Sequence, residues 1–162
     1  MRVAFQGEVG AYSESAVYSY FGPSVEVEPC RDLSDVFDRV ERGKTAYGVV
    51  PIENSLEGSV NQTYDLFLDR DLRVRGEVIL RIVHCLISNP ETELSALRRV
   101  YSHPQALAQC RGFLERLGCE LFSTYDTAGS VKMIKERGLR DAGAVAGERA
   151  AEIYGMRVLA RG

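Results

Sequence analysis

Short apolar segments alternate with longer amphipathic segments along almost the whole chain of 162 residues. Residues 2–5 and 47–52 have the length and apolar content of buried strands, whereas residues 12–21 and 33–42 carry apolar side chains at helical spacing. Where strands and helices alternate, right-handed crossovers connect the strands into largely parallel sheets. The pattern therefore predicts the α/β class.

The remaining segments continue this alternation, with one exception. The further predicted strands are residues 25–28, 99–101, 120–123, 143–146 and 157–159, and the further predicted helices are residues 60–68, 104–117, 127–137 and 148–154. The exception is residues 72–88, a strand-like run that is too long for one strand of a small sheet and has Gly76 as a bend. We expect this run to cross between two lobes. Lobe one is then residues 1–76 with a returning segment 156–162, and lobe two is residues 77–155.

The composition excludes several kinds of partner. A net charge of -3 provides no basic field for nucleic acid, and no apolar run is long enough to cross a membrane. The four cysteines form no CxxC pair, and no histidine lies at zinc-binding spacing from them, so we expect no metal. Free buried thiols and a start without a signal-peptide core predict a cytoplasmic protein.

One polar cluster directly follows the apolar segment 47–52. Glu53 and Asn54 come first, and Ser59 and Asn61 follow a few residues later. Open α/β sheets bind ligands beyond the carboxyl ends of their strands, so these side chains are candidates for a binding site. The structural alternative is a solvent-facing turn, with Asn54 in an Asx-turn and Ser59 as a helix cap.

A second polar cluster begins after strand 99–101. Ser102 closes this strand and Pro104 opens a helix, so Ser102 as the N-cap is the structural alternative to a ligand contact. Gln109 lies on the same predicted helix and faces either the site or solvent. Ser102 and His103 are adjacent on a capping turn and are not expected to form a nucleophile–base pair. His84, within an apolar run, is expected to be a core histidine rather than a base.

Two more segments start helices after strands. The turn from Gly10 to Ser13 and the segment at Thr127 could each present backbone amides to a carboxylate, although turn and capping geometry explain the same residues. Several helix N-termini around one crevice would favour a small organic dianion.

Taken in order, these motifs resemble the catalytic domain of prephenate dehydratase. The resemblance rests on residues 7–13, 50–55, 57–61, 101–110, 126–128 and 150–155. It implies a two-lobe fold like that of the type II periplasmic binding proteins, with mostly parallel sheets and the active site in an interlobe cleft. It also implies conversion of prephenate to phenylpyruvate in L-phenylalanine biosynthesis, without a metal or other cofactor.

The resemblance assigns roles to particular residues. Asn54, Ser102 and Gln109 would hydrogen-bond the substrate, and Glu53 would act near the leaving hydroxyl group. The candidates for further substrate binding are Gly10, Ser13, Ser59, Asn61 and Thr127.

One motif of the family is missing from the end of the sequence. The family's Thr-Arg-Phe motif, whose threonine is the favoured acid, does not occur before the final Gly162, and no ACT domain for sensing phenylalanine follows. We expect the chain to be a piece of a longer enzyme, weakly active or inactive alone. An exposed sheet edge in lobe one favours a homodimer or higher homo-oligomer. The alternatives are arogenate dehydratase and a non-catalytic binding module for small dicarboxylates.

Overall fold

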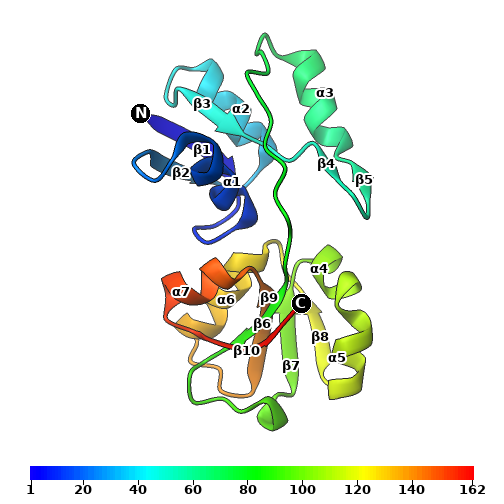
Figure 1. Cartoon of the computed structure of the whole chain (residues 1–162). Coiled ribbons are helices and arrows are strands. Elements are labelled where there is room, and N and C mark those ends of the chain that lie inside the picture. Colours follow the sequence, from blue (N-terminus) through cyan, green and yellow to red (C-terminus); the bar gives the residue numbers. More distant parts are fainter. The chain divides into compact units, whose positions relative to one another are not determined.

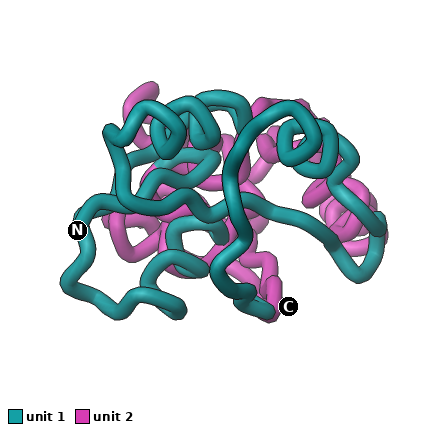
Figure 2. Tube along the Cα trace, turned by 90° about the horizontal axis from the view of Figure 1, so that it is seen from above, with its two compact units in different colours: residues 1–8, 12–80 teal, residues 9–11, 81–162 magenta.

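The computed structural model describes all 162 residues and divides them into two compact units (Figure 1, Figure 2). Unit 1 contains residues 1–8 and 12–80, and unit 2 contains residues 9–11 and 81–162. The predicted α/β class is confirmed, because strands alternate with helices in both units.

Unit 1 is built on a three-stranded parallel sheet in the order β2-β1-β3. The strands are β1 (Arg2–Gln6), β2 (Glu26–Cys30) and β3 (Tyr47–Val49), and the crossover helices are α1 (Tyr12–Phe21) and α2 (Leu33–Glu41). The central strand β1 has neighbours on both sides, and its residues Val3, Ala4 and Phe5 are fully buried. Helix α2 buries Leu33, Val36 and Phe37.

The rest of unit 1 is a small hairpin followed by a helix. Strands β4 (Glu53–Asn54) and β5 (Gly58–Ser59) pair antiparallel, and α3 (Asn61–Asp69) follows them. Phe67 of α3 packs against Phe37 of α2 with ring centroids 4.9 Å apart. Arg70, just after α3, forms ion pairs with Asp38 and Glu41. Helix α3 is therefore anchored to α2 rather than to the sheet.

Three expectations for unit 1 are wrong in detail. The predicted buried strand 47–52 ends at Val49, and Tyr47 and Ile52 are 38% and 43% exposed. The reason is that β3 lies at the sheet edge with β1 as its one neighbour, and Pro51 has no N–H for a ladder. Ser59 is not the cap of α3, because it lies in β5 and Val60 occupies the N-cap. In the strand-like run 72–88, residues 72–84 form no strand because they have no pairing partner.

Unit 2 contains a five-stranded mixed sheet in the order β10-β6-β9-β7-β8. Its strands are β6 (Cys85–Ser88), β7 (Arg99–Ser102), β8 (Glu120–Ser123), β9 (Ala142–Ala146) and β10 (Arg157–Arg161). Its helices are α4 (Pro104–Gln109), α5 (Arg111–Leu117), α6 (Thr127–Glu136), α7 (Glu148–Tyr154) and the short 3-10 helix η1 (Leu94–Ala96). Strands β7, β8 and β9 are parallel, whereas β6 runs antiparallel to both β9 and β10.

Two expectations for unit 2 are corrected. Residues 156–162 do not return to lobe one, because β10 pairs with β6 and belongs to unit 2. The predicted helix 104–117 is two helices that meet at Cys110, whose backbone has φ −98° and ψ 3°. The passage from unit 1 to unit 2 falls between Leu80 and Arg81, within the run expected to cross between lobes.

Candidate active site

In unit 1, two of the predicted motifs start from one edge of the sheet. Strands β1 and β3 are parallel neighbours, with Val3 opposite Tyr47 and Phe5 opposite Val49. Because parallel strands end at the same edge, the turn after Gln6 and the segment after Val49 both leave the sheet there. This is the edge at which an open α/β sheet binds ligands.

The β4–β5 hairpin arranges the side chains that follow β3. Glu53 lies opposite Ser59 in this hairpin, and Glu53, Ser59 and the nearby Asn61 are exposed. Asn54 is half-buried, and its Oδ1 accepts a hydrogen bond of 2.9 Å from the backbone N–H of Leu56. Asn54 therefore forms the Asx-turn that was the structural alternative, while its amide nitrogen is not engaged by this bond.

Thr63 supports this hairpin and was missed by the sequence analysis. Its hydroxyl donates a hydrogen bond of 2.7 Å to the carbonyl oxygen of Pro51, and the side chain is fully buried. The backbone N–H of Val60 donates to Ile52 O at 2.9 Å. Together these bonds connect the start of α3 to the segment before Glu53. The available signal in the sequence was a threonine in the first turn of a predicted helix.

The turn at Gly10 has a structural explanation of its own. Gly10 has φ +94°, and a Cβ atom there would lie 3.0 Å from Ala150 Cα. Tyr154 of the same helix, α7, donates from Oη to Val9 O at 2.8 Å. Glycine is therefore required at position 10 by conformation and by close packing. Ser13 is the second residue of α1 and is half-buried, and anion binding by this turn stays a prediction.

In unit 2, three helices begin at one edge of the sheet. The parallel strands β7, β8 and β9 end at Ser102, Ser123 and Ala146, and α4, α6 and α7 follow them. Asp126 caps α6, since its Oδ2 accepts a hydrogen bond of 2.6 Å from Gly129 N. Thr127, the first residue of α6, is half-buried beside this carboxylate. Asp126 thus already fills part of the acceptor position at this helix start.

Ser102 is fully buried, and its hydroxyl is used within the sheet. Its Oγ donates a hydrogen bond of 2.6 Å to Val145 O on the neighbouring strand β9. The N-cap of α4 is His103 rather than Ser102, because His103 Nδ1 accepts from Gln105 N at 3.3 Å. Ser102 and His103 therefore serve different partners, as expected, and form no nucleophile–base pair.

Gln109 forms a hydrogen bond with a residue outside its own helix, His84. Its Oε1 lies 2.8 Å from His84 Nε2, and both side chains are half-buried. His84 was expected to be a core histidine with its hydrogen bonds satisfied, without a named partner. The two residues are separated by 25 positions, so no local pattern could have paired them.

All four cysteines are free thiols. Burial raises the pKa of Cys110, and the neighbouring Cys85 raises it further. Burial also raises the pKa of Cys30, Cys85 and Cys119. These thiols are therefore protonated near neutral pH and are poor nucleophiles. No group of three or more His, Cys, Asp or Glu side chains is placed to hold a metal ion.

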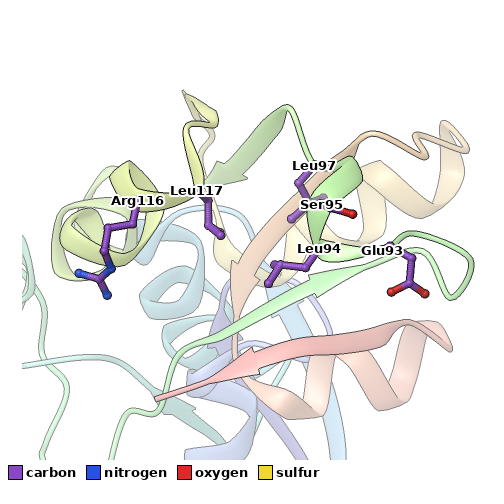
Figure 3. Close-up of a pocket in the computed structure, with 6 residues that line it drawn as sticks. All are labelled: Glu93, Leu94, Ser95, Leu97, Arg116 and Leu117. Carbon is purple, nitrogen blue, oxygen red and sulfur yellow. The ribbon is translucent and has the colours of Figure 1, made fainter.

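A pocket of about 440 Å³ lies elsewhere in unit 2, beside η1 and the end of α5 (Figure 3). Leucines form much of its wall, and Glu93 and Arg116 are its charged residues. Glu93 forms an ion pair with Arg157, and the guanidinium of Arg116 stacks over Phe113. None of the predicted site residues lines this pocket. It is not the predicted active site.

Parallel strands that end in polar side chains, as in these two α/β units, are typical of the class of α/β proteins that bind small molecules. The chain belongs to the prephenate dehydratase family, because the family model described as "Prephenate dehydratase" matches residues 3–162. Glu53, Asn54, Ser102 and Gln109 all lie within the matched range. No helix of the structure is both long and apolar enough to span a membrane.

Curated relatives include plant and bacterial enzymes. The chain is 48% identical over 161 residues to arogenate dehydratase/prephenate dehydratase 2, chloroplastic, of Arabidopsis thaliana, which covers 99% of the chain and 42% of that protein. It is 40% identical to the bifunctional chorismate mutase/prephenate dehydratase of Stutzerimonas stutzeri, over 99% of the chain and 44% of that protein. The chain therefore spans less than half the length of these relatives.

Solved structures share the fold. The prephenate dehydratase of Arthrobacter aurescens, in complex with L-Phe, has a TM-score of 0.91 and 28% identity, and the match covers 99% of this chain and 55% of that one. GqqA, described as a novel type of quorum quenching acylase, has a TM-score of 0.90 and 35% identity, over 99% of this chain and 59% of that one. A periplasmic substrate-binding protein of Coxiella burnetii has a TM-score of 0.50 and 13% identity, over 100% and 79% of the two chains. The likeness to a periplasmic binding protein concerns the fold alone.

Proposed function

We propose that the protein containing this chain is a prephenate dehydratase that acts in L-phenylalanine biosynthesis. The observation that carries this proposal is the family match over residues 3–162, which includes all the residues assigned to catalysis. Because the chain spans about 42% of a relative such as the Arabidopsis thaliana enzyme, the activity is proposed for the whole protein.

The proposed reaction uses the driving force of aromatisation. The bond between the ring carbon and its carboxylate breaks, its electron pair enters the ring, and the ring C–O bond breaks at the opposite carbon. Carbon dioxide leaves, and the hydroxyl group leaves as water after it gains a proton. The protein has to orient two carboxylates and assist the departing hydroxyl group, which is work for hydrogen-bond donors placed before the reaction.

The proposed residue roles combine the family resemblance with the hydrogen-bonding groups that each side chain still offers. Asn54 and Gln109 each have an amide nitrogen outside their recorded hydrogen bonds, and we assign both to substrate oxygens. Glu53, an exposed carboxylate beside Ser59 in the hairpin, is assigned to the region of the leaving hydroxyl group. Ser102 already donates its proton to Val145 O, so its assigned contact with substrate is as an acceptor. The further substrate-binding candidates are Gly10, Ser13, Ser59, Asn61 and Thr127.

These assignments draw on both units. Glu53 and Asn54 belong to unit 1, whereas Ser102 and Gln109 belong to unit 2. A crystal structure with a bound substrate analogue tests all four contacts, and an analogue that leaves one of these side chains uncontacted would contradict the role of that residue.

The test of the activity is direct turnover. The protein is expressed from its complete reading frame, and formation of phenylpyruvate from prephenate is followed against a control without enzyme, because prephenate also decomposes spontaneously. We expect saturable turnover that is lost in Gln109→Ala. Absence of turnover with retained prephenate binding would instead support the non-catalytic module.

Arogenate dehydratase is the second candidate. It is favoured by the relatives, since the Arabidopsis thaliana protein carries both activities in its name. Arogenate has an ammonium group where prephenate has a ketone, so the ratio of kcat/KM for the two substrates separates the candidates. A larger kcat/KM for arogenate would replace the first proposal with the second.

An acylase activity is not proposed, although one structural neighbour is described as an acylase. A serine–histidine acylase needs a serine hydroxyl that donates to the histidine. Here Ser102 donates to Val145 O, and His103 Nδ1 accepts from Gln105 N.

We further propose a cytoplasmic location, supported by the four free thiols. Fractionation of cells tests it, and recovery in an organelle such as the chloroplast would contradict it.

A further inference from the structure

His84 and Gln109 join two parts of unit 2 that are separated by 25 residues. His84 immediately precedes β6, and Gln109 is the last residue of α4. The contact is a hydrogen bond of 2.8 Å between His84 Nε2 and Gln109 Oε1, and both side chains are half-buried. This bond therefore connects Gln109, which is proposed to contact substrate, to the residue that precedes β6.

Core packing holds the backbones on both sides of this bond. Leu86 of β6 and Ala106 and Leu107 of α4 belong to one buried cluster, against which Cys110 also packs. Close-packed side chains of this kind restrict movement of the elements that carry them. This packing does not by itself fix the half-buried Gln109 side chain, which has three rotatable bonds, and the hydrogen bond to His84 restricts it.

The chemistry of the two groups determines the direction of the bond. An amide oxygen carries no hydrogen, so the His84 nitrogen that faces it must carry one. The ring is then the Nε2–H tautomer or the doubly protonated form. While Nε2 carries its hydrogen, a half-turn of the carboxamide would bring its amino group against that N–H, and two donors would face each other. The rotated carboxamide would be accepted only by the other neutral tautomer, in which Nδ1 carries the hydrogen. With a hydrogen on Nε2, His84 therefore favours the orientation seen in the structure, and in that orientation both amide hydrogens of Gln109 remain outside the bond.

We propose that His84 is a positioning residue, which holds the Gln109 carboxamide so that its amino group donates to a carboxylate or hydroxyl oxygen of the substrate. This inference rests on the proposed function, because it takes Gln109 as a substrate-binding residue. It explains why a histidine, rather than an aliphatic residue, continues the apolar run into β6. His84 does not transfer a proton in this proposal.

The kinetic test compares two substitutions in the protein expressed from its complete reading frame. His84→Phe keeps a planar ring without a donor, whereas His84→Gln keeps an N–H that can reach Gln109 Oε1. We expect His84→Phe to lower kcat/KM by about tenfold or more, since small misplacements of positioned groups are costly, and His84→Gln to restore part of the loss. In a Gln109→Ala background, His84→Phe should cause no further loss, because the group it positions is already gone.

Two outcomes of the kinetic test would overturn the inference. One is full activity of His84→Phe where Gln109→Ala is impaired. The other is a double variant whose loss of transition-state stabilisation equals the sum of the losses in the two single variants, which would mean that His84 acts independently of Gln109. Thermal melting of each variant shows whether a loss of activity is only a loss of folded protein. Where His84→Phe does not fold, His84→Gln and the spectroscopic test below decide.

The spectroscopic test does not depend on turnover. His84 and His103 are the histidines of these 162 residues, and the His84 signal in ¹H–¹⁵N correlation spectra of the imidazole rings is assigned by its loss in His84→Gln. We expect a proton on His84 Nε2 whose chemical shift and protection from exchange change in Gln109→Ala. His103 serves as the internal control, because its Nδ1 accepts from Gln105 N. A His84 ring with an unprotonated Nε2 overturns the inference. Absence of turnover in the wild-type protein would overturn the proposed function, while this measurement still decides the His84–Gln109 bond.

Discussion

Asn54 has two hydrogen-bonding groups, and they have separate tasks. The side-chain oxygen accepts from Leu56 N at 2.9 Å and forms the turn between β4 and β5. The side-chain nitrogen takes no part in that bond and is the group proposed to donate to substrate. Substitutions that remove one group and keep the other can therefore separate folding of the hairpin from catalysis.

Asn54→Asp and Asn54→Ala form such a matched pair. The aspartate keeps the acceptor for Leu56 N but loses the donor, whereas alanine loses both. We expect turnover to fall by about 10²- to 10³-fold in Asn54→Ala, and at least as far in Asn54→Asp, where a negative charge also opposes the substrate carboxylates. The midpoint of urea unfolding should fall in Asn54→Ala alone. A fully active Asn54→Asp protein would contradict the donor role.

Cys110 follows Gln109 directly, but its thiol has no catalytic task. Burial, and then the neighbouring Cys85, raises its pKa, so it is a neutral thiol near pH 7. We expect Cys110→Ser to leave kcat unchanged within error, as measured beside Cys119→Ser, a second half-buried thiol whose pKa is also raised by burial. Loss of activity in Cys110→Ser with Cys119→Ser unaffected would show that a cysteine takes part after all.

At the scale of the elements, Thr63 connects α3 to the segment that carries the site. Its buried hydroxyl donates to Pro51 O, and removing it leaves that carbonyl group without this partner. We expect the nearly isosteric Thr63→Val to lower the free energy of unfolding by about 1–3 kcal/mol and to reduce turnover by displacing Glu53. Thr63→Ser, which keeps the hydroxyl, is the control. Denaturation and kinetics measure the two effects, and an unchanged Thr63→Val protein would rule out the anchoring role.

The sheet of unit 2 carries an ion pair between β7 and the start of β9. Arg99 contacts Asp141 through two hydrogen bonds, Nη2 to Oδ1 at 2.6 Å and Nε to Oδ2 at 3.2 Å. The hydrogen bond from Arg99 is the largest cause that lowers the pKa of Asp141 below its ordinary value of 3.8. A carboxyl group with a lowered folded-state pKa stabilises the protein above its unfolded-state pKa, and this stabilisation is lost as the pH falls through the folded-state pKa.

Asp141→Asn should therefore have a pH-dependent effect. We expect its urea midpoint to lie slightly below that of the wild type at pH 7. The difference should shrink as the pH falls from about 3.8 through the lower folded-state pKa of Asp141, below which the wild-type carboxyl group is also neutral. The effect is small because the side chain of Asp141 is 45% exposed. Glu91→Gln, in an ion pair with both side chains more than 70% exposed, is the control and should show no difference. A difference that stays constant with pH would point to packing rather than charge.

At the scale of the whole molecule, unit 1 leaves much apolar surface uncovered. The outer strands β2 and β3 each have one neighbour in their sheet. Large exposed apolar side chains are Tyr20, Tyr47, Ile52, Leu56, Tyr64, Leu68, Val74 and Ile79. Unpaired strand edges and apolar surface favour association with a second copy. We expect a homodimer or higher homo-oligomer in sedimentation velocity at micromolar concentration, and a monomer at every concentration would contradict this.

Most element boundaries could be predicted from the sequence because they depend on local interactions. Helices α1 and α7 occupy the predicted residues 12–21 and 148–154, since helical spacing and end signals such as Gly155, with φ +62°, lie within a few residues of one another. The polar clusters at the ends of strands could also be located from the sequence, because each follows its apolar segment within a few residues. The family of the chain was predicted from the order of its motifs, and the match over residues 3–162 confirms it.

Contacts between distant residues were decided by the tertiary structure. The strand after Met156 pairs with β6 in unit 2, although the sequence was interpreted as returning to lobe one. The hydroxyl of Ser102 donates to Val145 O across the sheet, and Gln109 meets His84 from another element. A helix satisfies its backbone hydrogen bonds within one segment, so its sequence can specify it alone. A strand or a polar side chain depends on a partner far away in the chain, and only the folded protein selects which partner that is.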